Sequence, residues 1–139
     1  MTGALVLIGT LVVAGAAGLI LRSRSGRVRT APVSSLPADV RGVLDPAAAV
    51  TLVQLSTTFC APCRHTRVLL SDLASRTSGL HHAEIDLTER PELARELSVL
   101  RTPTTLAIDG SGRELLRVGG VPKRDSLLAA LQPHLIAQS

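Results

Sequence analysis

The apolar positions fall into one long uncharged run and a series of shorter segments with strand or helix periodicity. The run covers residues 2–21 and at helical rise would be roughly 30 Å long, the thickness of a bilayer's hydrocarbon core. It predicts one transmembrane helix. A cleaved signal peptide is the alternative, because Ala14-Gly15-Ala16 resembles a small-residue cleavage site. The uncleaved helix is favoured because no base precedes the run and a positive cluster follows it.

Residues 22–38 are rich in Arg, Ser, Pro and Gly and have little periodicity, so we expect a linker that lifts a soluble domain off the membrane. Short flanks rich in arginine stay on the cytoplasmic side, which predicts the N-terminus outside and the domain in the cytoplasm. The opposite topology, with an extracytoplasmic domain, is the alternative. Thr10, Ala14 and Gly18 recur at a spacing that permits close helix packing, but the oligomeric state stays open.

The remaining residues, 39–139, predict a single soluble domain whose core covers about 50–135. A buried strand, a helix and a second strand come first, followed by a helix that begins at Pro91, a β-hairpin and a last helix. The order is βαβ followed by ββα, which predicts an α/β fold with a mixed central sheet and helices on both faces. The expected elements are strands over 51–56, 83–87, 104–109 and 113–118, and helices over 60–76, 91–100 and 123–131.

Charge and aromatic content exclude nucleic-acid binding. The chain carries 15 Lys+Arg and 11 Asp+Glu, a formal charge of +4. The four arginines of residues 1–35, with no acid among them, account for the whole excess, so the remainder is neutral. Phe59 is the single aromatic residue, which leaves no platform for stacked bases.

The chemistry of the chain lies in its two cysteines, Cys60 and Cys63. They follow the first strand of the domain and open a helix, where free N–H groups and the helix dipole favour a thiolate over a thiol. Cys60, at the tip, is the candidate nucleophile, and Cys63 lies one turn later, where it can resolve a mixed disulfide. Arg64 and Arg67 either add to thiolate stabilisation or reach solvent.

Cysteines at this spacing could also serve other roles. They could be buried apolar residues without a redox role. A structural metal site needs four ligands, and the four histidines have no zinc-finger spacing, so no metal is expected. Covalent haem attachment is excluded because Arg64 stands where that motif requires histidine.

Beyond FCAPC, a Thr-Pro pair precedes a strand and Val118-Gly119-Gly120 precedes the last helix. In this order the segments resemble the thioredoxin-like family. The resemblance implies a thioredoxin-like fold in which Pro103 is cis and faces the cysteines. It also implies that Thr102 offers backbone groups to an extended substrate. The substrate-binding residues implied are Phe59, Pro62, Thr102, Pro103 and Gly119.

The chain departs from the family at a buried charged pair. Gln54 stands where thioredoxins carry an aspartate that acts in proton transfer, and His82 aligns with its lysine partner. Glutamine accepts no proton at neutral pH, so the family's general base is absent. One hypothesis gives His82 part of that role, or routes the proton through water. The other treats Gln54 and His82 as a structural polar pair.

These features predict a membrane-anchored thiol-disulfide oxidoreductase that exchanges dithiol and disulfide with protein substrates, without a bound organic cofactor. In the cytoplasm it would be a reductase, with a membrane-embedded redox partner near its anchor. Two alternatives stay open. One is a membrane-tethered adaptor or chaperone without turnover. The other is an extracytoplasmic oxidoreductase linked to cytochrome or secreted-protein maturation.

Overall fold

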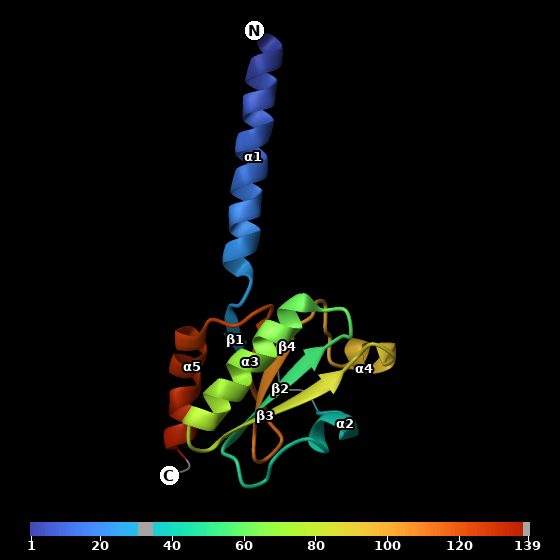
Figure 1. Ribbon diagram of the computed structural model, residues 1–139, viewed down its shortest axis with the longest axis vertical. Coiled ribbons are helices and arrows are strands. Elements are labelled where there is room, and N and C mark those ends of the chain that lie inside the picture. The colour runs from blue at the N-terminus through green and yellow to red at the C-terminus, as the bar shows by residue number, and fades with distance from the viewer. Residues whose placement is uncertain (31–34, 138–139) are drawn as a thin grey trace.

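The computed structural model describes residues 1–30 and 35–137, which form a long N-terminal helix and a domain built on one five-stranded sheet (Figure 1). The strand order is β1-β5-β4-β2-β3. The helices are α1 (Thr2–Arg24), α2 (Ala38–Arg41), α3 (Ala61–Arg76), α4 (Pro91–Glu96) and α5 (Arg124–Ile136). The strands are β1 (Val28–Thr30), β2 (Val50–Ser56), β3 (Leu80–Asp86), β4 (Thr104–Asp109) and β5 (Glu114–Gly119).

The sheet is mixed, as the sequence predicts. β2 pairs in parallel with β3 and antiparallel with β4, and all seven of its residues are buried, which explains its continuous apolar run. β4 and β5 form the predicted hairpin. At its turn, the carboxylate of Asp109 accepts hydrogen bonds from the backbone N–H groups of Ser111 and Arg113.

Two hydrophobic clusters lie on opposite faces of the sheet, so helices cover both sides (Figure 1). On one face, Leu70 of α3 and Leu127 of α5 belong to the same cluster as Leu52 of β2. On the other face, Val40 of α2 and Leu93 of α4 cluster with side chains of β2, β3 and β4. Alternate residues of β2 thus serve the two faces, and α3, the helix that begins at the cysteines, is held against the sheet by the buried side chains of Leu70 and Leu73.

α1 extends away from the domain, and none of its residues is buried (Figure 1). It is 23 residues long with a mean hydropathy of 2.5, enough to cross a membrane by length and composition, and signal sequences share that character. Arg22 and Arg24 lie in its last turn. An apolar surface of this extent would be unfavourable in water.

The segment expected as a linker, 22–38, differs from that expectation. α1 continues to Arg24, and Val28–Thr30 form β1, which pairs antiparallel with β5 at the edge of the sheet. Residues 31–34 of the expected linker lie outside the described residues. Amino-acid composition does not predict β1, because the strand is stabilised by pairing with the backbone of β5 and by Val28, which packs against the core.

Two helix ends also differ from the pattern. The helix at Pro91 ends at Glu96, because Ser98 adopts a left-handed φ of 54° that turns the chain toward β4. α5 continues past Pro133 to Ile136, and the N–H of Ala137 donates to the carbonyl of Pro133 at its end.

Candidate active site

The two cysteines lie where β2 ends and α3 begins, and they form a disulfide with Cα atoms 5.2 Å apart. Cys60 is the N-cap of α3, and its sulfur accepts a hydrogen bond from the backbone N–H of Cys63 at 3.2 Å. Pro62 lies in the first helical turn, where the missing N–H costs nothing. The same N–H and the helix dipole would stabilise a thiolate at Cys60 once the disulfide is reduced.

The two sulfur-bearing residues differ in access. Cys63 is 1% exposed, whereas Cys60 is only partly buried. Phe59, directly before Cys60, is 98% exposed. An incoming protein therefore meets Cys60 first, beside a bare aromatic ring, and reaches Cys63 only through Cys60.

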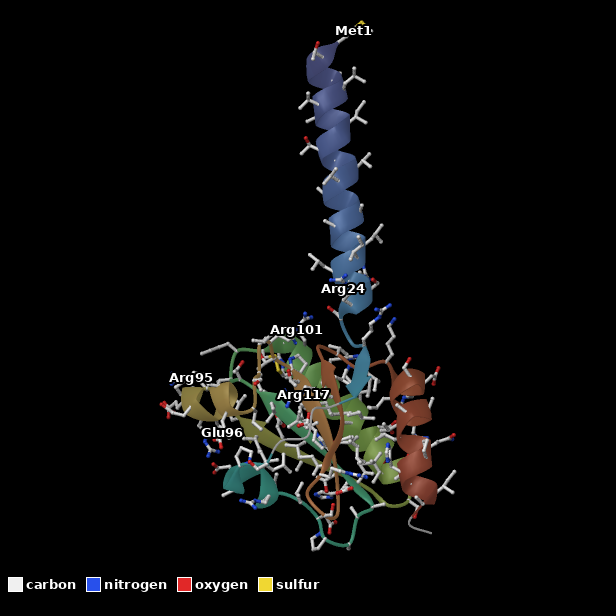
Figure 2. The ribbon with its side chains drawn as sticks, turned by 180° about the vertical axis from the view of Figure 1, so that it is seen from behind. Met1, Arg24, Arg95, Glu96, Arg101 and Arg117 are labelled. Atoms are coloured by element: carbon white, nitrogen blue, oxygen red, sulfur yellow. A yellow bond between two sulfur atoms is a disulfide. The ribbon has the colours of Figure 1, made fainter. Side chains whose placement is uncertain are left out.

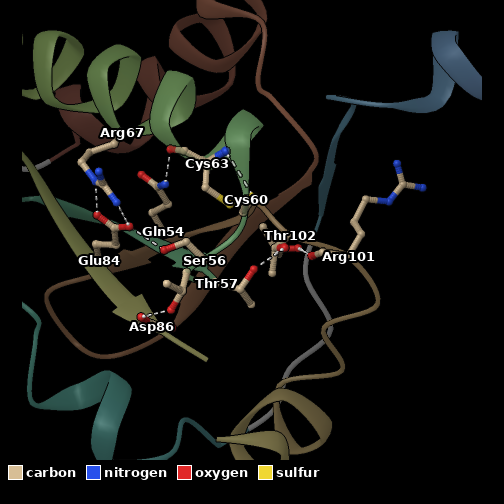
Figure 3. The surroundings of a disulfide bond; sticks show 12 residues. Gln54, Ser56, Thr57, Cys60, Cys63, Arg67, Glu84, Asp86, Arg101 and Thr102 are labelled. Carbon is tan, nitrogen blue, oxygen red and sulfur yellow. Dashed lines mark hydrogen bonds and ion pairs between the residues drawn. A yellow bond between two sulfur atoms is a disulfide. The ribbon is translucent and has the colours of Figure 1, made fainter. Parts of the chain in front are cut away.

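The Thr102–Pro103 peptide bond is cis, in agreement with what the resemblance implies. The hydroxyl oxygens of Thr102 and Thr57 lie 3.4 Å apart, which places this loop beside the loop that carries Cys60 (Figure 3). The carbonyl of Pro103 accepts a hydrogen bond from the N–H of Gly120 at 2.7 Å, so Gly119 and the proline share one side of the site. The structure thus brings the predicted cysteine and Thr-Pro segments together.

Gln54 lies fully buried beneath the disulfide and is held at both ends of its amide. Its Nε2 donates to the carbonyl of Cys63 at 2.8 Å, and its Oε1 lies 3.1 Å from Nε2 of His82. Because a carbonyl only accepts, the amide orientation is fixed, and Nε2 of His82 must carry the proton. Nδ1 of His82 lies 3.0 Å from the hydroxyl of Ser71 on α3. A neutral polar chain thus runs from α3 through β3 to the second cysteine.

Arg67 forms an ion pair with Glu84 and does not point at the cysteines. Arg67 donates two hydrogen bonds to the carboxylate of Glu84, which also accepts one from Ser56 (Figure 3). The Arg67 hydrogen bond holds the pKa of Glu84 below its ordinary value. The charge of Arg67 is therefore directed at Glu84 on β3. Within residues 1–30 and 35–137, no three His, Cys, Asp or Glu side chains are grouped as a metal site would require.

The histidine of this chain leads to a prediction for stability. Burial holds the pKa of His82 below its ordinary value of 6.5, against a smaller opposing effect of Glu84. The folded chain then binds this proton less readily than the unfolded chain, so stability is full above pH 6.5 and falls as the pH drops below it. We expect His82→Asn to flatten this fall between about pH 7 and pH 5 in urea unfolding of the oxidised protein.

His81→Asn, one position earlier on β3, controls for the loss of a strand histidine. Equal pH slopes in His82→Asn and the unaltered protein would contradict the prediction. The same variant tests the proton-transfer hypothesis, since an unchanged pH profile of disulfide reduction would leave His82 a structural role only.

Two residues beside the site were not among the sequence candidates. Leu100 is 96% exposed, and Arg101, just before the Thr-Pro pair, places its side-chain carbons against Gly119. Arg101 also donates a hydrogen bond to Ser25, 76 residues earlier, at 3.1 Å. The one sequence feature that indicates Leu100 is its position three residues before Pro103. No feature of the sequence indicates the contact between Arg101 and Ser25.

The geometry defines a class of protein: a mixed sheet whose first buried strand delivers a CxxC disulfide to a helix N-terminus beside a cis-proline loop. The family model described as Thioredoxin matches residues 39–133. The chain belongs to the thioredoxin family.

Individual relatives agree. Thioredoxin H2-2 of rice (Oryza sativa subsp. japonica) is 37% identical over 76 residues, 55% of this chain and 55% of that protein. The bifunctional thioredoxin reductase/thioredoxin of Mycobacterium leprae is 33% identical over 81 residues, 58% of this chain and 18% of that protein. The chain thus spans about half the length of the first of these relatives and less of the second.

Solved structures show the same fold. Thioredoxin of Fasciola hepatica superposes with a TM-score of 0.58 at 24% identity and covers 70% of this chain and 92% of its own. A thioredoxin of Nicotiana alata has a TM-score of 0.54 at 27% identity, with 62% and 73% covered. The predicted thioredoxin-like fold is confirmed.

Proposed function

We propose that the chain is a membrane-anchored thiol-disulfide oxidoreductase that acts on protein substrates. The observation that carries the proposal is the asymmetry of the dithiol. Cys60 is reachable at the N-cap of α3 and accepts an N–H hydrogen bond at sulfur, whereas Cys63 is buried behind it. The family relatives named thioredoxin support the same activity.

In the reducing direction, the Cys60 thiolate attacks one sulfur of a substrate disulfide. That bond breaks, a mixed disulfide forms, and the other substrate sulfur leaves as a thiolate that takes up a proton. Cys63 loses its proton and attacks Cys60, which closes the Cys60–Cys63 disulfide and releases the second substrate thiol. Two electrons pass from the chain to the substrate. We assign substrate binding to Phe59, Thr102, Pro103 and Gly119, and Pro62 shapes the first turn of α3.

The anchor supports a cytoplasmic reductase. α1 is apolar up to its last turn, which carries Arg22 and Arg24, and the positive-inside rule favours the cytoplasmic side for a domain that follows such a turn. The reducing poise there would keep the dithiol reduced between turnovers. A partner that resupplies electrons from within the membrane is consistent with the position of the anchor.

Two measurements test the proposal. The full chain in detergent should reduce a soluble protein disulfide, with dithiothreitol as electron source, well above the rate of dithiothreitol alone. Equal rates would contradict oxidoreductase activity. In intact cells, an impermeant maleimide should label the cysteines only after permeabilisation and without added reductant. Labelling of unpermeabilised cells would instead place the domain outside.

A further inference from the structure

The connection between α1 and the domain is short and built into the fold. Only residues 25–27 separate Arg24, the last residue of α1, from Val28, the first residue of β1. Gly26 is buried, with a left-handed φ of 73°, and its N–H donates to the carbonyl of Gly119 at 2.8 Å. A Cβ at this position would collide with the carbonyl oxygen of Val121. The connection therefore fixes the domain beside the end of α1.

The end of the domain beside α1 is the one that carries the redox site. Arg101 donates to Ser25, directly after α1, and immediately precedes the Thr102–Pro103 bond. Arg24 and Arg101 lie at the same end of the domain (Figure 2), where the N-terminal end of α3 also lies (Figure 1). Arg101, Thr102 and Cys60 are neighbours in the site (Figure 3). If α1 spans a bilayer, the disulfide lies at the end of the domain that faces it.

Unpaired cations surround this junction. A pocket of about 220 Å³ is lined by Arg24, Arg27 and Arg101 together with Leu100 and Gly119. Among the described residues, none of these three arginines forms an ion pair with a carboxylate. If α1 spans a bilayer, these arginines lie next to its surface, where cations are attracted to the phosphates of anionic lipids. This attraction would hold this end of the domain against the headgroup layer. The exposed Leu100 beside them adds an apolar contact for the same surface.

From this geometry we infer that the redox site faces the lipid headgroups and that its substrate is a disulfide in a membrane protein, located at the bilayer surface. The inference rests on the proposed function of the site and the anchor. A three-residue connection gives Cys60 a high effective concentration toward cysteines at the membrane surface and little reach toward cysteines held far above it. The electrons pass from the reduced dithiol to that disulfide, as in the steps above.

The test uses the full chain in nanodiscs of anionic lipid, with dithiothreitol as reductant. The first substrate is a transmembrane peptide with a cysteine at each end, at the bilayer surface. Each cysteine is joined by a disulfide to a thiol dye. A second peptide carries the same dye at the end of a 20-residue helical spacer, about 30 Å farther out. Release of the dye measures reduction. We expect the surface dye to be released at least about tenfold faster than the raised dye.

A variant with twelve Gly/Ser residues inserted between Arg24 and Ser25 keeps β1 and the Ser25–Arg101 contact but frees the domain to move by about 20 Å. We expect its preference for the surface dye to fall to within about twofold. The same twelve residues added at the C-terminus provide the matched control and should keep the preference.

Equal release of both dyes by the unaltered chain would overturn the inference, as would an insertion variant that keeps the preference. A soluble dye disulfide separates these outcomes from failure of the proposed function. All three proteins should reduce it at the same rate. If none reduced it, the oxidoreductase proposal itself would fail, and the substrate assignment with it.

Discussion

Replacing Cys60 with serine is expected to lower the rate of disulfide reduction by a factor on the order of 10³ or more, because the attacking sulfur is lost. Cys63→Ser is expected to behave differently. Cys60 stays accessible at the tip of α3 and still attacks, but no second thiol resolves the product. The Cys63 variant should therefore stop after one attack and accumulate a mixed disulfide with its substrate.

Non-reducing gels and intact-protein mass spectrometry measure the trapped species, and single-turnover kinetics measure the attack. The two variants control for each other, since each removes one sulfur from the same disulfide. The contrary pattern, a trapped species in Cys60→Ser and none in Cys63→Ser, would reverse the assignment of attacking and resolving cysteines. It would also require the 1% exposed Cys63 to be reached directly.

The parts of the molecule that the sequence predicted well are those determined by local pattern. The apolar run of β2 needs burial on both faces, and the turn after Asp109 carries its own side-chain hydrogen bonds, so both signals are complete within a few residues. The position of Cys60 at the start of a helix follows in the same way from the strand before it and the periodicity after it. For this reason the fold and the position of the two cysteines could be predicted from the sequence.

The parts that could not be predicted depend on contacts between distant segments. β1 has only three residues, and its pairing with β5 joins positions about 90 apart in the chain. No propensity argument detects so short a strand within an Arg- and Ser-rich segment. The contact of Arg101 with Ser25 is equally invisible in the sequence, although it joins the loop before the Thr102–Pro103 bond to the residue that follows α1. Composition predicted a flexible linker over residues 22–38, whereas tertiary contacts fix the connection between α1 and β1.

The fixed tether has its own test at Gly26. Replacing Gly26 with alanine is expected to lower the free energy of unfolding of the domain by about 2–4 kcal/mol. Alanine disfavours the left-handed φ of 73°, and its Cβ would meet the backbone carbonyl of Val121, which cannot move aside as a side chain could. The hydrogen bond from Gly26 to Gly119 would be lost as the connection shifted. Urea unfolding in detergent, followed by far-ultraviolet circular dichroism, measures the change.

Gly110→Ala is the matched control, because a Cβ at Gly110 has only an ordinary contact, 3.7 Å from the carbonyl oxygen of Ala48, and its φ lies outside the left-handed region. Its effect should stay within about 0.5 kcal/mol. Equal stability of the two variants would show that the connection at Gly26 is loose. A destabilised Gly26→Ala domain should also lose part of its preference for the surface dye in nanodiscs while still reducing the soluble dye. Both effects would have one cause, because Gly26 ties the connection to Gly119 of β5 and, under the proposed membrane-facing site, sets the distance between the disulfide and the bilayer.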